Sequence, residues 1–586
     1  MMGRLVRRWS VLPAILLAVA LAACAGPTTR APGGAAGGQP SGQAGGTRTI
    51  TLGFTAGVQS MSIMGATTTS GGWQSLNETH SNGLVTSDTN TRRPIPRLAA
   101  RLPSLDDGTI ALLPDGRMRV VYPLRTDVTW QDGARFTAQD LVFSYKVNSD
   151  QGLPSSQRDV INQVESVEAP DDATFVLFFK VPYYIAGTMG IRPFWPHPQH
   201  ILGAAYERYL ETKNVDDLIN QPYWTNEYVH LGPFRLTEFD PGEGITLRAY
   251  DGYFLGRPKV DVVKLRSFSD QNTLFSNLLS HTVDAFPDIA LSAELGYQLK
   301  ERWESSGQGS VHAKQGITWF LAPQWRPSVQ TELANLDPRV RAALYQALDR
   351  VALSDALQGG HPELAAWSML PPGDQHYEAT RDALRPYAFD QDRSRALLRD
   401  AGWTPGPDGI LRHSSDGRRF HNAIWTTPGR DREVAAFAAF WRQIGLEVDE
   451  FNVPAAQVRN LEYRATYPSW ESSAQGSSDA ILGRMDPPPS SAATRWVGER
   501  GGFEDPRAYD LVARYRASLS ERDQSQAMKA ISDYVAAELP FLILYYVPDH
   551  VGARKGVKAF DDHEGGAEGA RPFGTYTRNA HLWEVQ

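Results

Sequence analysis

The sequence predicts a folded body of the α/β or α+β class. From Arg48 onward, short runs of β-branched and aromatic residues alternate with stretches rich in Ala and Leu, which is the pattern of mixed strands and helices. The chain has 586 residues and a single Cys, so it can form several domains and is not one small disulfide-stapled module. Charged residues make up 21% and hydrophobic residues 41%, which excludes a wholly disordered chain and a polytopic membrane protein.

Strands are expected where β-branched and aromatic residues fill runs of about six to eight residues. In the first of these runs, Met118, Val120 and Tyr122 alternate with less apolar neighbours, as in a half-buried strand. The predicted strands are residues 117–124, 174–179, 245–250, 260–266 and 541–547.

Helix starts are marked more sharply. Thr137 with Asp140 and Ser520 with Asp523 form capping-box patterns, the second ahead of a stretch that reaches residue 537. A helix at residues 392–401 should end at Gly402, where a left-handed residue is favourable.

The pair Asp337-Pro338 is a further strong start signal. Apolar residues then recur at positions 340, 344 and 348 on one face, and we expect a single helix that runs to Gly359-Gly360. The Ser-rich residues 472–478 and the Pro-rich residues 486–489 are typical of loops.

The first 23 residues have the pattern of a secretory signal peptide. Three Arg precede an apolar run at residues 11–23, which is too short to span a bilayer. The run ends in Leu-Ala-Ala-Cys at residues 21–24, which resembles the lipobox of bacterial lipoproteins, and Cys24 is the only thiol in the chain. We expect a mature protein that begins at Cys24 and is held at the membrane only by a lipid anchor, with residues 24–47 as a flexible Gly/Ala/Pro-rich tether.

The net charge argues against nucleic acid as a partner. Removal of residues 1–23 takes away three Arg and no acid, which changes the formal charge from −8 to −11. Phosphate backbones attract clustered Lys and Arg, not an acidic chain of this kind.

Signature motifs of the common catalytic sites are absent from the sequence. There is no Gly-x-Ser-x-Gly elbow, Ser-x-x-Lys, His-Glu-x-x-His or phosphate-binding Gly-x-x-x-x-Gly-Lys-Ser/Thr. His197 and His200 are three residues apart, but Pro198 between them opposes a shared helical face, so an exposed turn is favoured over a metal site. We therefore expect no enzyme activity, no metal and no cofactor.

Aromatic residues are abundant, with 15 Trp, 22 Tyr and 23 Phe. Trp combines a large apolar face with one hydrogen-bond donor, which suits a cleft that closes over a small ligand. Packing within or between domains is the more ordinary use of any one of them.

Five blocks of the sequence carry extended motifs. They are residues 122–145 (containing Val-Thr-Trp-Gln-Asp-Gly and Phe-Thr-Ala-Gln-Asp-Leu-Val-Phe-Ser-Tyr), 231–236 (Leu-Gly-Pro-Phe-Arg-Leu), 250–258, 337–350 and 395–403. The longest block predicts a strand, an Asp-Gly turn and a capped helix. Together the blocks resemble the extracytoplasmic solute-binding proteins of the peptide/nickel ABC importers, the oligopeptide- and dipeptide-binding family.

The resemblance implies a periplasmic-binding-protein fold of the class II type, with two lobes joined by a hinge and an additional domain. By analogy, lobe 1 would comprise residues 48–85, 226–318 and 545–586, the additional domain residues 86–225, and lobe 2 residues 319–544. Such proteins close over a solute by hinge motion and present the closed form to a permease.

The resemblance also implies ligand-binding residues between the lobes. Peptide-binding relatives hold the amino terminus of the ligand with a carboxylate and often its carboxyl terminus with an Arg, because buried charges need partners. In those relatives the carboxylate is an Asp that follows a Trp; this chain matches the Trp at Trp470 but has no Asp after it. Glu471 or Asp479 is therefore a candidate for the role of that Asp, and the alternative is that both are solvated loop acids. The expected ligand-binding residues are Ser70, Gly71, Gly72, Trp73, Trp319, Arg430, Trp470 and Glu471, with an exposed ion pair to Asp431 as the alternative for Arg430.

These features together predict a lipid-anchored monomeric receptor outside the cytoplasmic membrane that captures an oligopeptide-like solute and delivers it to an ABC permease. A non-peptide solute such as an oligosaccharide or another nutrient is the alternative ligand. An exported enzyme or chaperone on the same fold, and a receptor that presents solute to a sensor, are the alternatives of another class.

Overall fold

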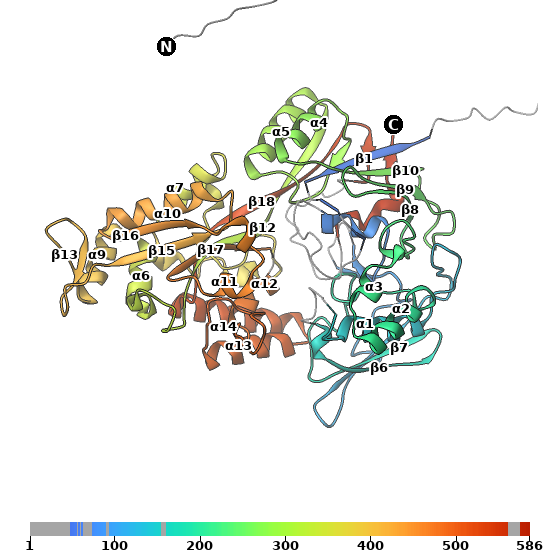
Figure 1. Ribbon diagram of the computed structural model, residues 1–586, viewed down its shortest axis with the longest axis horizontal. Coiled ribbons are helices and arrows are strands. Elements are labelled where there is room, and N and C mark those ends of the chain that lie inside the picture. Colours follow the sequence, from blue (N-terminus) through green and yellow to red (C-terminus); the bar gives the residue numbers. More distant parts are fainter. Residues whose placement is uncertain are drawn as a thin grey trace, which may run out of the picture. The chain divides into compact units, whose positions relative to one another are not determined.

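The computed structural model (Figure 1) describes residues 47–55, 57–58, 60–61, 73–88, 93–153, 160–476, 478–560 and 575–586. The expected signal peptide, Cys24 and almost all of the tether lie outside these residues, as do Ser70, Gly71 and Gly72. Residues 47–586 form one compact unit, and everything below concerns that unit.

A ten-stranded mixed sheet is the largest element of the fold. Its pairs β1–β10, β1–β11, β15–β16 and β15–β17 are parallel, and the other pairs are antiparallel. In spatial order the strands are β16 (Glu447–Asn452), β15 (His421–Thr426), β17 (Trp470–Gln475), β12 (Gly309–Pro323), β18 (Leu542–Arg554), β11 (Ala285–Phe286), β1 (Thr49–Phe54), β10 (Val262–Ser267), β9 (Gly244–Ala249) and β8 (Phe234–Asp240).

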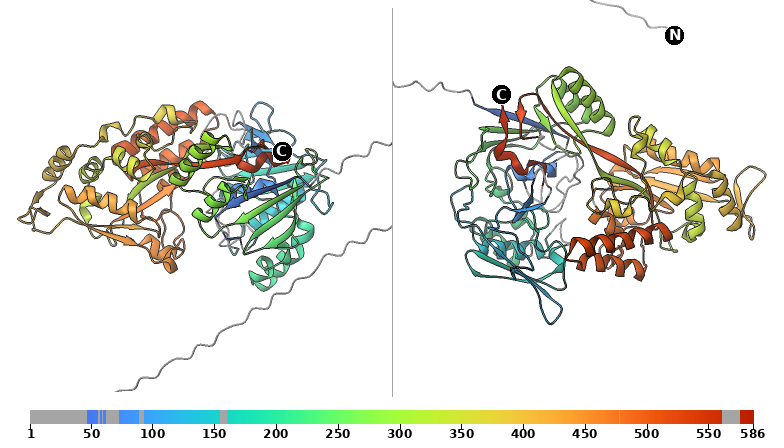
Figure 2. Two further views of the ribbon diagram at one scale, coloured as in Figure 1. Left: turned by 90° about the horizontal axis from the view of Figure 1, so that it is seen from above. Right: turned by 180° about the vertical axis from the view of Figure 1, so that it is seen from behind.

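The two longest strands connect the two ends of this sheet. β12 has 15 residues and β18 has 13, and they pair in antiparallel register from Gly309 with Arg554 to Leu321 with Leu542. Their course can be followed in Figure 1 and from two further directions in Figure 2. The lobe boundaries expected at 318/319 and 544/545 fall inside these strands, so any hinge there would bend a paired ribbon of two strands.

Four shorter sheets complete the β structure. A four-stranded antiparallel sheet lies within the range expected for the additional domain, one two-stranded sheet lies at the start of that range, and two more lie later in the chain. The four-stranded sheet runs β4 (Ile110–Leu112), β5 (Met118–Pro123), β7 (Thr174–Phe179) and β6 (Val164–Asp171); the pairs are β2 (Val85–Ser87) with β3 (Pro94–Pro96), β13 (Trp403–Pro405) with β14 (Leu411–His413), and β19 (Val557–Lys558) with β20 (Glu584–Val585).

Helices fill the connections between the strands. They are α1 (Ala138–Ser149), α2 (Gln199–Thr212), α3 (Asp216–Ile219), α4 (Gln271–Leu279), α5 (Ala293–Ser306), α6 (Pro338–Gln346), α7 (Arg350–Leu357), α8 (Tyr377–Thr380), α9 (Gln391–Asp400), α10 (Asp431–Gln443), α11 (Leu461–Ala465), α12 (Ser478–Leu482), α13 (Pro506–Ala517) and α14 (Glu521–Glu538). Within the described part of the chain, none of the helices combines the length and the apolar character that a bilayer span requires.

The predicted strands and helix starts are confirmed. In β5 the side chains of Met118, Val120 and Tyr122 are buried and those between them are half-buried, as the alternation predicts. The Thr137 N–H donates to the Asp140 carboxylate at 3.0 Å at the start of α1, and the Ser520 hydroxyl accepts from the Asp523 N–H at the start of α14. β7 and α9 match their predicted ranges to within a residue, whereas β18 continues seven residues past the predicted end.

The single helix predicted from Asp337 to Gly359 is wrong. The chain forms α6 and α7, separated at residues 347–349. The carboxylate of Asp349 accepts hydrogen bonds from the N–H groups of Val351 and Ala352 at 3.1 and 3.0 Å, so it caps a second helix. An Asp that caps competes with helix continuation, and the apolar periodicity does not register that competition.

The loop predicted at residues 472–478 is also wrong in part. Residues 472–475 belong to β17, where they pair with residues 318–321 of β12. Ser and Ala do not favour a strand locally, but pairing with β12 continues from the buried start of β17 at Trp470 and Glu471 and outweighs that preference.

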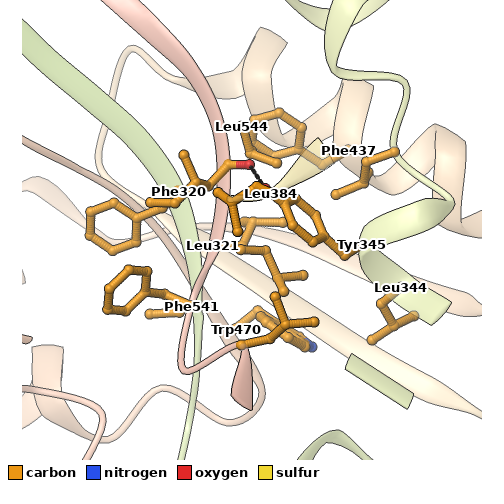
Figure 3. Close-up of a cluster of buried hydrophobic side chains, with 14 of the residues drawn as sticks. Phe320, Leu321, Leu344, Tyr345, Leu384, Phe437, Trp470, Phe541 and Leu544 are labelled. Carbon is orange, nitrogen blue, oxygen red and sulfur yellow. Dashed lines mark hydrogen bonds between the residues drawn. The ribbon is translucent and has the colours of Figure 1, made fainter. Parts of the chain in front are cut away.

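Four clusters of buried apolar side chains form the core. The largest contains residues between Trp319 and Tyr546 only, and Figure 3 shows part of it around Phe320, Leu344 and Trp470. Within this cluster the Tyr345 hydroxyl donates to the Ile543 carbonyl at 2.5 Å, which satisfies a buried polar group.

Candidate ligand cavity

Strand β17 presents different side chains on its two faces. Successive side chains of a strand point to opposite sides of the sheet. Trp470 and Ser472 therefore share one face, and Glu471 and Ser473 share the other. Two of the predicted ligand residues are neighbours in sequence but belong to opposite layers of the fold.

On the first face, Trp319 and Arg430 lie together. The Trp319 indole N–H donates to the Ser472 hydroxyl at 3.0 Å, and the ring stacks on Tyr545 with centroids 6.1 Å apart. The Arg430 guanidinium lies 4.8 Å from the centroid of the Trp319 ring, in cation–π geometry. The structure thus brings two of the predicted site residues into contact, although Trp319 is only 5% exposed.

Arg430 pairs with Glu433, and the ion pair considered with Asp431 does not form. Arg430 immediately precedes α10, and its guanidinium is 3.2 Å from the Glu433 carboxylate one turn along the helix. The Asp431 carboxylate instead accepts a hydrogen bond from the Asn452 side chain. The Arg430 side chain is 47% exposed, so this pair is worth little to stability.

Trp470 lies in the interior of the protein. Its side chain has no exposed surface and lies among the apolar residues labelled in Figure 3. Its ring meets Trp441 of α10 edge-on, with centroids 5.3 Å apart. The structure therefore gives this residue a packing role, and its contact with a ligand stays a prediction.

On the second face, Glu471 is at the centre of a cluster of arginines. Its Oε1 atom is 2.5 Å from Arg464 Nη2 and 2.5 Å from Arg500 Nη1, and its Oε2 atom is 3.4 Å from Arg484 Nη1. Burial by itself raises the pKa of the Glu471 carboxyl, but the charges of Arg500, Arg484 and Arg464 outweigh burial and hold the pKa below its ordinary value.

Glu471 is thus neither a solvated loop acid nor an open anchor for an ammonium group. The residue is only 1% exposed, and both of its carboxylate oxygens already have cationic partners. The other candidate, Asp479, has a side chain outside the described part of the structure.

A cavity of about 790 Å³ adjoins this second face. This size is within the usual range for small-ligand sites. Part of its wall comes from the range expected for the additional domain and consists of Gln151, Asn162 and Gln163. The rest of the wall comes from the range expected for lobe 2, and its polar residues are Gln475, Arg484, Asp486, Thr494, Arg495, Glu499, Arg500 and Arg516.

Arg484 is the most buried arginine of the cavity wall. Its side chain is 5% exposed, its Nη2 atom lies 3.2 Å from the Ser473 hydroxyl, and its guanidinium lies 4.9 Å from the centroid of the Phe320 ring. The Nε atom of Arg484 has no hydrogen-bond partner among the described residues, a feature that it shares with six other arginines.

The predicted ligand residues that the structure describes do not line this cavity. Trp73 packs in the core against Phe54 and His80, with ring centroids 5.5 and 6.1 Å away. Trp319, Arg430 and Trp470 lie on the opposite face of the sheet, and Glu471 reaches the wall only through Arg484 and Arg500.

A second hollow of about 620 Å³ lies between α5 and the end of α7. Its wall contains Tyr297 and His361, whose rings stack with centroids 3.6 Å apart, and four acids, Glu294, Glu301, Glu304 and Asp355. It has no buried charged group comparable to Arg484, and we regard the larger cavity as the candidate site.

The histidines considered as metal ligands have separate hydrogen-bond partners. His197 is fully buried, not in an exposed turn as predicted, and its Nε2 atom lies 3.2 Å from Asn148 Oδ1. His200 instead pairs with Asp132 at 2.8 Å. Among the described residues, no group of three His, Cys, Asp or Glu side chains is placed to hold a metal ion.

Comparison with known proteins identifies the family. Residues 94–493 match the model of the bacterial extracellular solute-binding proteins, family 5. This match covers well over half of the chain. The chain belongs to family 5 of the bacterial extracellular solute-binding proteins.

Three proteins of known sequence or structure are similar to this chain. The oligopeptide-binding protein AppA of Bacillus subtilis (strain 168) is 24% identical over 464 residues, which are 77% of this chain and 79% of AppA. The oligopeptide-binding protein of Thermus thermophilus, complexed with a pentapeptide, superimposes with a TM-score of 0.73 at 21% identity and covers 92% of this chain and 96% of its own. AgaA from A. tumefaciens R10, in complex with agropinic acid, gives a TM-score of 0.65 at 18% identity and covers 92% and 99%.

The predicted family and fold class are therefore confirmed. The two-lobe α/β fold of family 5 accounts for the large mixed sheet. The family is one of solute-binding proteins and not of enzymes.

Sequence reasoning missed the arginines of the cavity wall in this family 5 protein. Arg484, Arg495 and Arg500 follow β17 and flank residues 486–489, which the sequence predicts as a Pro-rich loop. The available signal was the density of arginines between residues 484 and 516, which loop composition alone does not explain.

Proposed function

We propose that this family 5 protein is a lipid-anchored receptor that binds a small solute, an oligopeptide or a compound of similar size, and delivers it to an ABC importer. The observation that carries the proposal is the cavity of about 790 Å³, whose polar wall is built from residues far apart in the sequence. A wall of this kind offers hydrogen-bond donors and acceptors to a polar solute while excluding bulk water.

Closure of the wall around the solute is part of the proposal. Gln151, Asn162 and Gln163 on one side and the arginines on the other come from the additional domain and lobe 2 as the sequence predicts them. A ligand that contacts both sides stabilises the arrangement in which they approach each other, because it has more contacts in that arrangement than in any other. A permease that recognises this arrangement would then receive loaded receptors selectively.

A peptide is one candidate solute, and a non-peptide solute is the second. AppA of Bacillus subtilis and the Thermus thermophilus protein bind oligopeptides by name, and AgaA was solved with agropinic acid, so the same fold accommodates both kinds of ligand. Glu471 is the acid expected to hold the amino group of a peptide, but its carboxylate oxygens pair with arginines. This pairing favours the non-peptide solute, because the expected partner for a peptide amine is already engaged.

Binding is tested by calorimetry and thermal unfolding of the full-length protein against peptides and oligosaccharides. A saturable site should appear for at least one class, and the ligand should raise the Tm, since a ligand at a hundred times its Kd stabilises the folded state by about 2.7 kcal/mol. A protein that binds no member of either library contradicts the proposed receptor role.

The lipid anchor is tested separately through Cys24. In cells supplied with radiolabelled palmitate, the protein should become labelled and sediment with membranes, because two or more acyl chains give stable anchoring. The variant Cys24→Ala should lose the label and appear in the soluble exported fraction. Equal labelling of the variant and the parent contradicts the anchor.

A further inference from the structure

The charges around the candidate cavity do not balance. Its wall carries four arginines, Arg484, Arg495, Arg500 and Arg516, and two acids, Asp486 and Glu499, and it contains no Lys. A hollow lined by an excess of one sign concentrates ions of the opposite sign, because the field lines are focused between low-dielectric walls.

The acids in and behind the wall already form hydrogen bonds or ion pairs with other groups of the protein. Glu499 is 5% exposed, and its two oxygens accept the N–H groups of Gly501 and Phe503 at 2.6 and 2.8 Å. Asp486 forms an ion pair with Arg516, and Glu471 pairs with three arginines behind the wall. Each of these carboxylates therefore already has a hydrogen-bond or ion-pair partner within the protein.

The arginines, by contrast, keep unused capacity. Arg484 contacts Glu471 and Ser473, and the second acid near it, Glu499, is 4.0 Å from its Nη1 atom. Arg495 is exposed at the cavity and forms no ion pair with a described residue. Arg500 is 27% exposed and uses its Nη1 atom for Glu471.

Arg326, which lies outside the cavity wall, adds to the excess of positive charge around the cavity. Arg326 donates to the carbonyl oxygens of Ala465, Ser490 and Arg500 at 2.5 to 3.0 Å, and its guanidinium has no acid among its described partners. Its charge is therefore compensated only by neutral dipoles. A charge in this position raises the potential next to Arg500 further.

We infer that the solute of this cavity is a net anion with two or more carboxylates, held by the arginines at positions 484, 495 and 500. This inference rests on the proposed receptor function and names the chemical class of its solute. Guanidinium groups present paired N–H donors that match a carboxylate, and partial burial makes such a contact stronger than it would be in water.

Two sources of this chemistry are possible, an acidic peptide and a non-peptide polycarboxylate. Calorimetry on the full-length protein distinguishes them with matched probes: tetraglutamate against tetraglutamine and tetralysine, and tricarballylate against its triamide. We expect one of the two anions to bind at least ten-fold tighter than its neutral counterpart and to weaken as NaCl is raised, since salt screens charge pairs that water can reach. The anion that binds identifies the source.

Two cavity variants and one control variant test where the anion binds. Arg495→Gln should weaken binding of the anion by about five-fold, the effect of about 1 kcal/mol from one partly solvated charge, and Arg500→Gln should weaken it as well. Arg393→Gln is the control, because Arg393 is exposed on α9, is absent from the cavity wall and forms no ion pair with a described residue. Thermal unfolding of each variant verifies that it is folded.

The possible outcomes are distinct. Equal or tighter binding of tetraglutamine, tetralysine or the triamide overturns the inference and leaves the receptor function intact. The same holds if none of these probes binds while a member of the peptide or oligosaccharide library does. An affinity unchanged in both cavity variants, or reduced equally by Arg393→Gln, overturns it too, because the charge that matters would then lie elsewhere.

Discussion

At the scale of single residues, the role of Glu471 is decided by the number of its partners. A buried carboxylate costs several kcal/mol of desolvation, and one cation rarely repays that cost. Glu471 has three cations within 3.4 Å, which is enough to keep it charged at full burial. Its function is to hold Arg484 and Arg500 in place at the cavity wall, and removing its charge should disturb both.

The variant Glu471→Gln tests this role. It leaves the cations of Arg464, Arg484 and Arg500 together without their shared counterion, and we expect a loss of about 3–5 kcal/mol in the free energy of unfolding. Urea unfolding at neutral pH measures the loss. The control is Glu450→Gln, which removes half of a surface pair with Arg442 at 2.7 Å and should cost less than about 1 kcal/mol. Similar costs for the two variants would contradict the central position of Glu471.

The same carboxyl predicts a dependence on acid pH. Because the pKa of Glu471 is lower in the folded state than in the unfolded chain, folding favours its charged form. Its stabilising effect is complete above the unfolded pKa of about 4.3 and is lost as the pH falls through the folded value. The difference in stability between the parent and Glu471→Gln should therefore shrink below about pH 4, and a difference that stays constant there would contradict the shift.

At the scale of secondary structure, two glycines in helices make opposite predictions. Gly296 in α5 faces the ring of His550 on β18, and a Cβ atom there would lie 2.2 Å from the ring. Gly203 in α2 has only the end of the Gln199 side chain nearby, at 3.8 Å. Ala is favoured over Gly in helices by about 1 kcal/mol, and this preference applies equally at both positions. The two substitutions therefore differ only in the room available for the added Cβ atom.

We expect Gly296→Ala to destabilise the protein by about 1–3 kcal/mol, because the His550 ring is also held edge-on by Tyr297 at 4.6 Å and cannot yield freely. Gly203→Ala should leave stability unchanged or raise it by up to about 1 kcal/mol. Thermal unfolding of both variants provides the measurement. If the two substitutions shift the Tm in the same direction, α5 does not pack on β18 as closely as described.

The break between α6 and α7 gives another prediction at this scale. Asp349→Ala removes the acceptor for two N–H groups at the start of α7, and a lost N-cap costs about 0.5–2 kcal/mol. Asp533→Ala on α14 is a suitable control, because Asp533 is 60% exposed and pairs only with Lys529 on the surface. Chemical denaturation should separate the variants, and equal stability of both would mean that the cap contributes nothing.

The elements also show which local patterns can be predicted from sequence. Alternation in β5 and the caps at Thr137 and Ser520 act over three to six residues, and these predictions are confirmed. The break at Asp349 and the strand at residues 472–475 depend on a competing cap and on neighbours in the sheet, which lie far along the chain. Sequence reasoning fails where a distant partner outweighs a local preference.

At the scale of the whole molecule, the candidate site follows the same rule. The resemblance to a family correctly predicts the fold, since its motifs are strands, turns and caps. It could not predict that Trp470 and Glu471 would lie in opposite layers with different partners, because the burial of each depends on segments elsewhere in the chain, α10 for Trp470 and Arg464, Arg484 and Arg500 for Glu471. The arginines of the wall become a set only when the folded chain brings residues 484–516 together beside Gln151, Asn162 and Gln163.

Buried histidines in three parts of the molecule predict that its stability falls in mild acid. His80, His197 and His550 are each buried, and burial lowers the pKa of each to about 3. The unfolded chain takes up protons below about pH 6.5, whereas the folded state does not until a much lower pH. The folded state is therefore favoured above pH 6.5, and each residue removes up to about 1.4 kcal/mol of stability per pH unit below it.

Urea unfolding at pH 7.5 and pH 5.5 tests this prediction. The free energy of unfolding should be clearly lower at pH 5.5, and it should change little between pH 7.5 and 8.5, where all three side chains are neutral in both states. The variant His197→Gln, which can keep a hydrogen bond to Asn148, should reduce the loss between the two lower pH values. Carboxylates such as Glu471 cannot cause that loss, because their charge changes only nearer pH 4. A stability equal at pH 7.5 and 5.5 would mean that water reaches these rings in the folded protein.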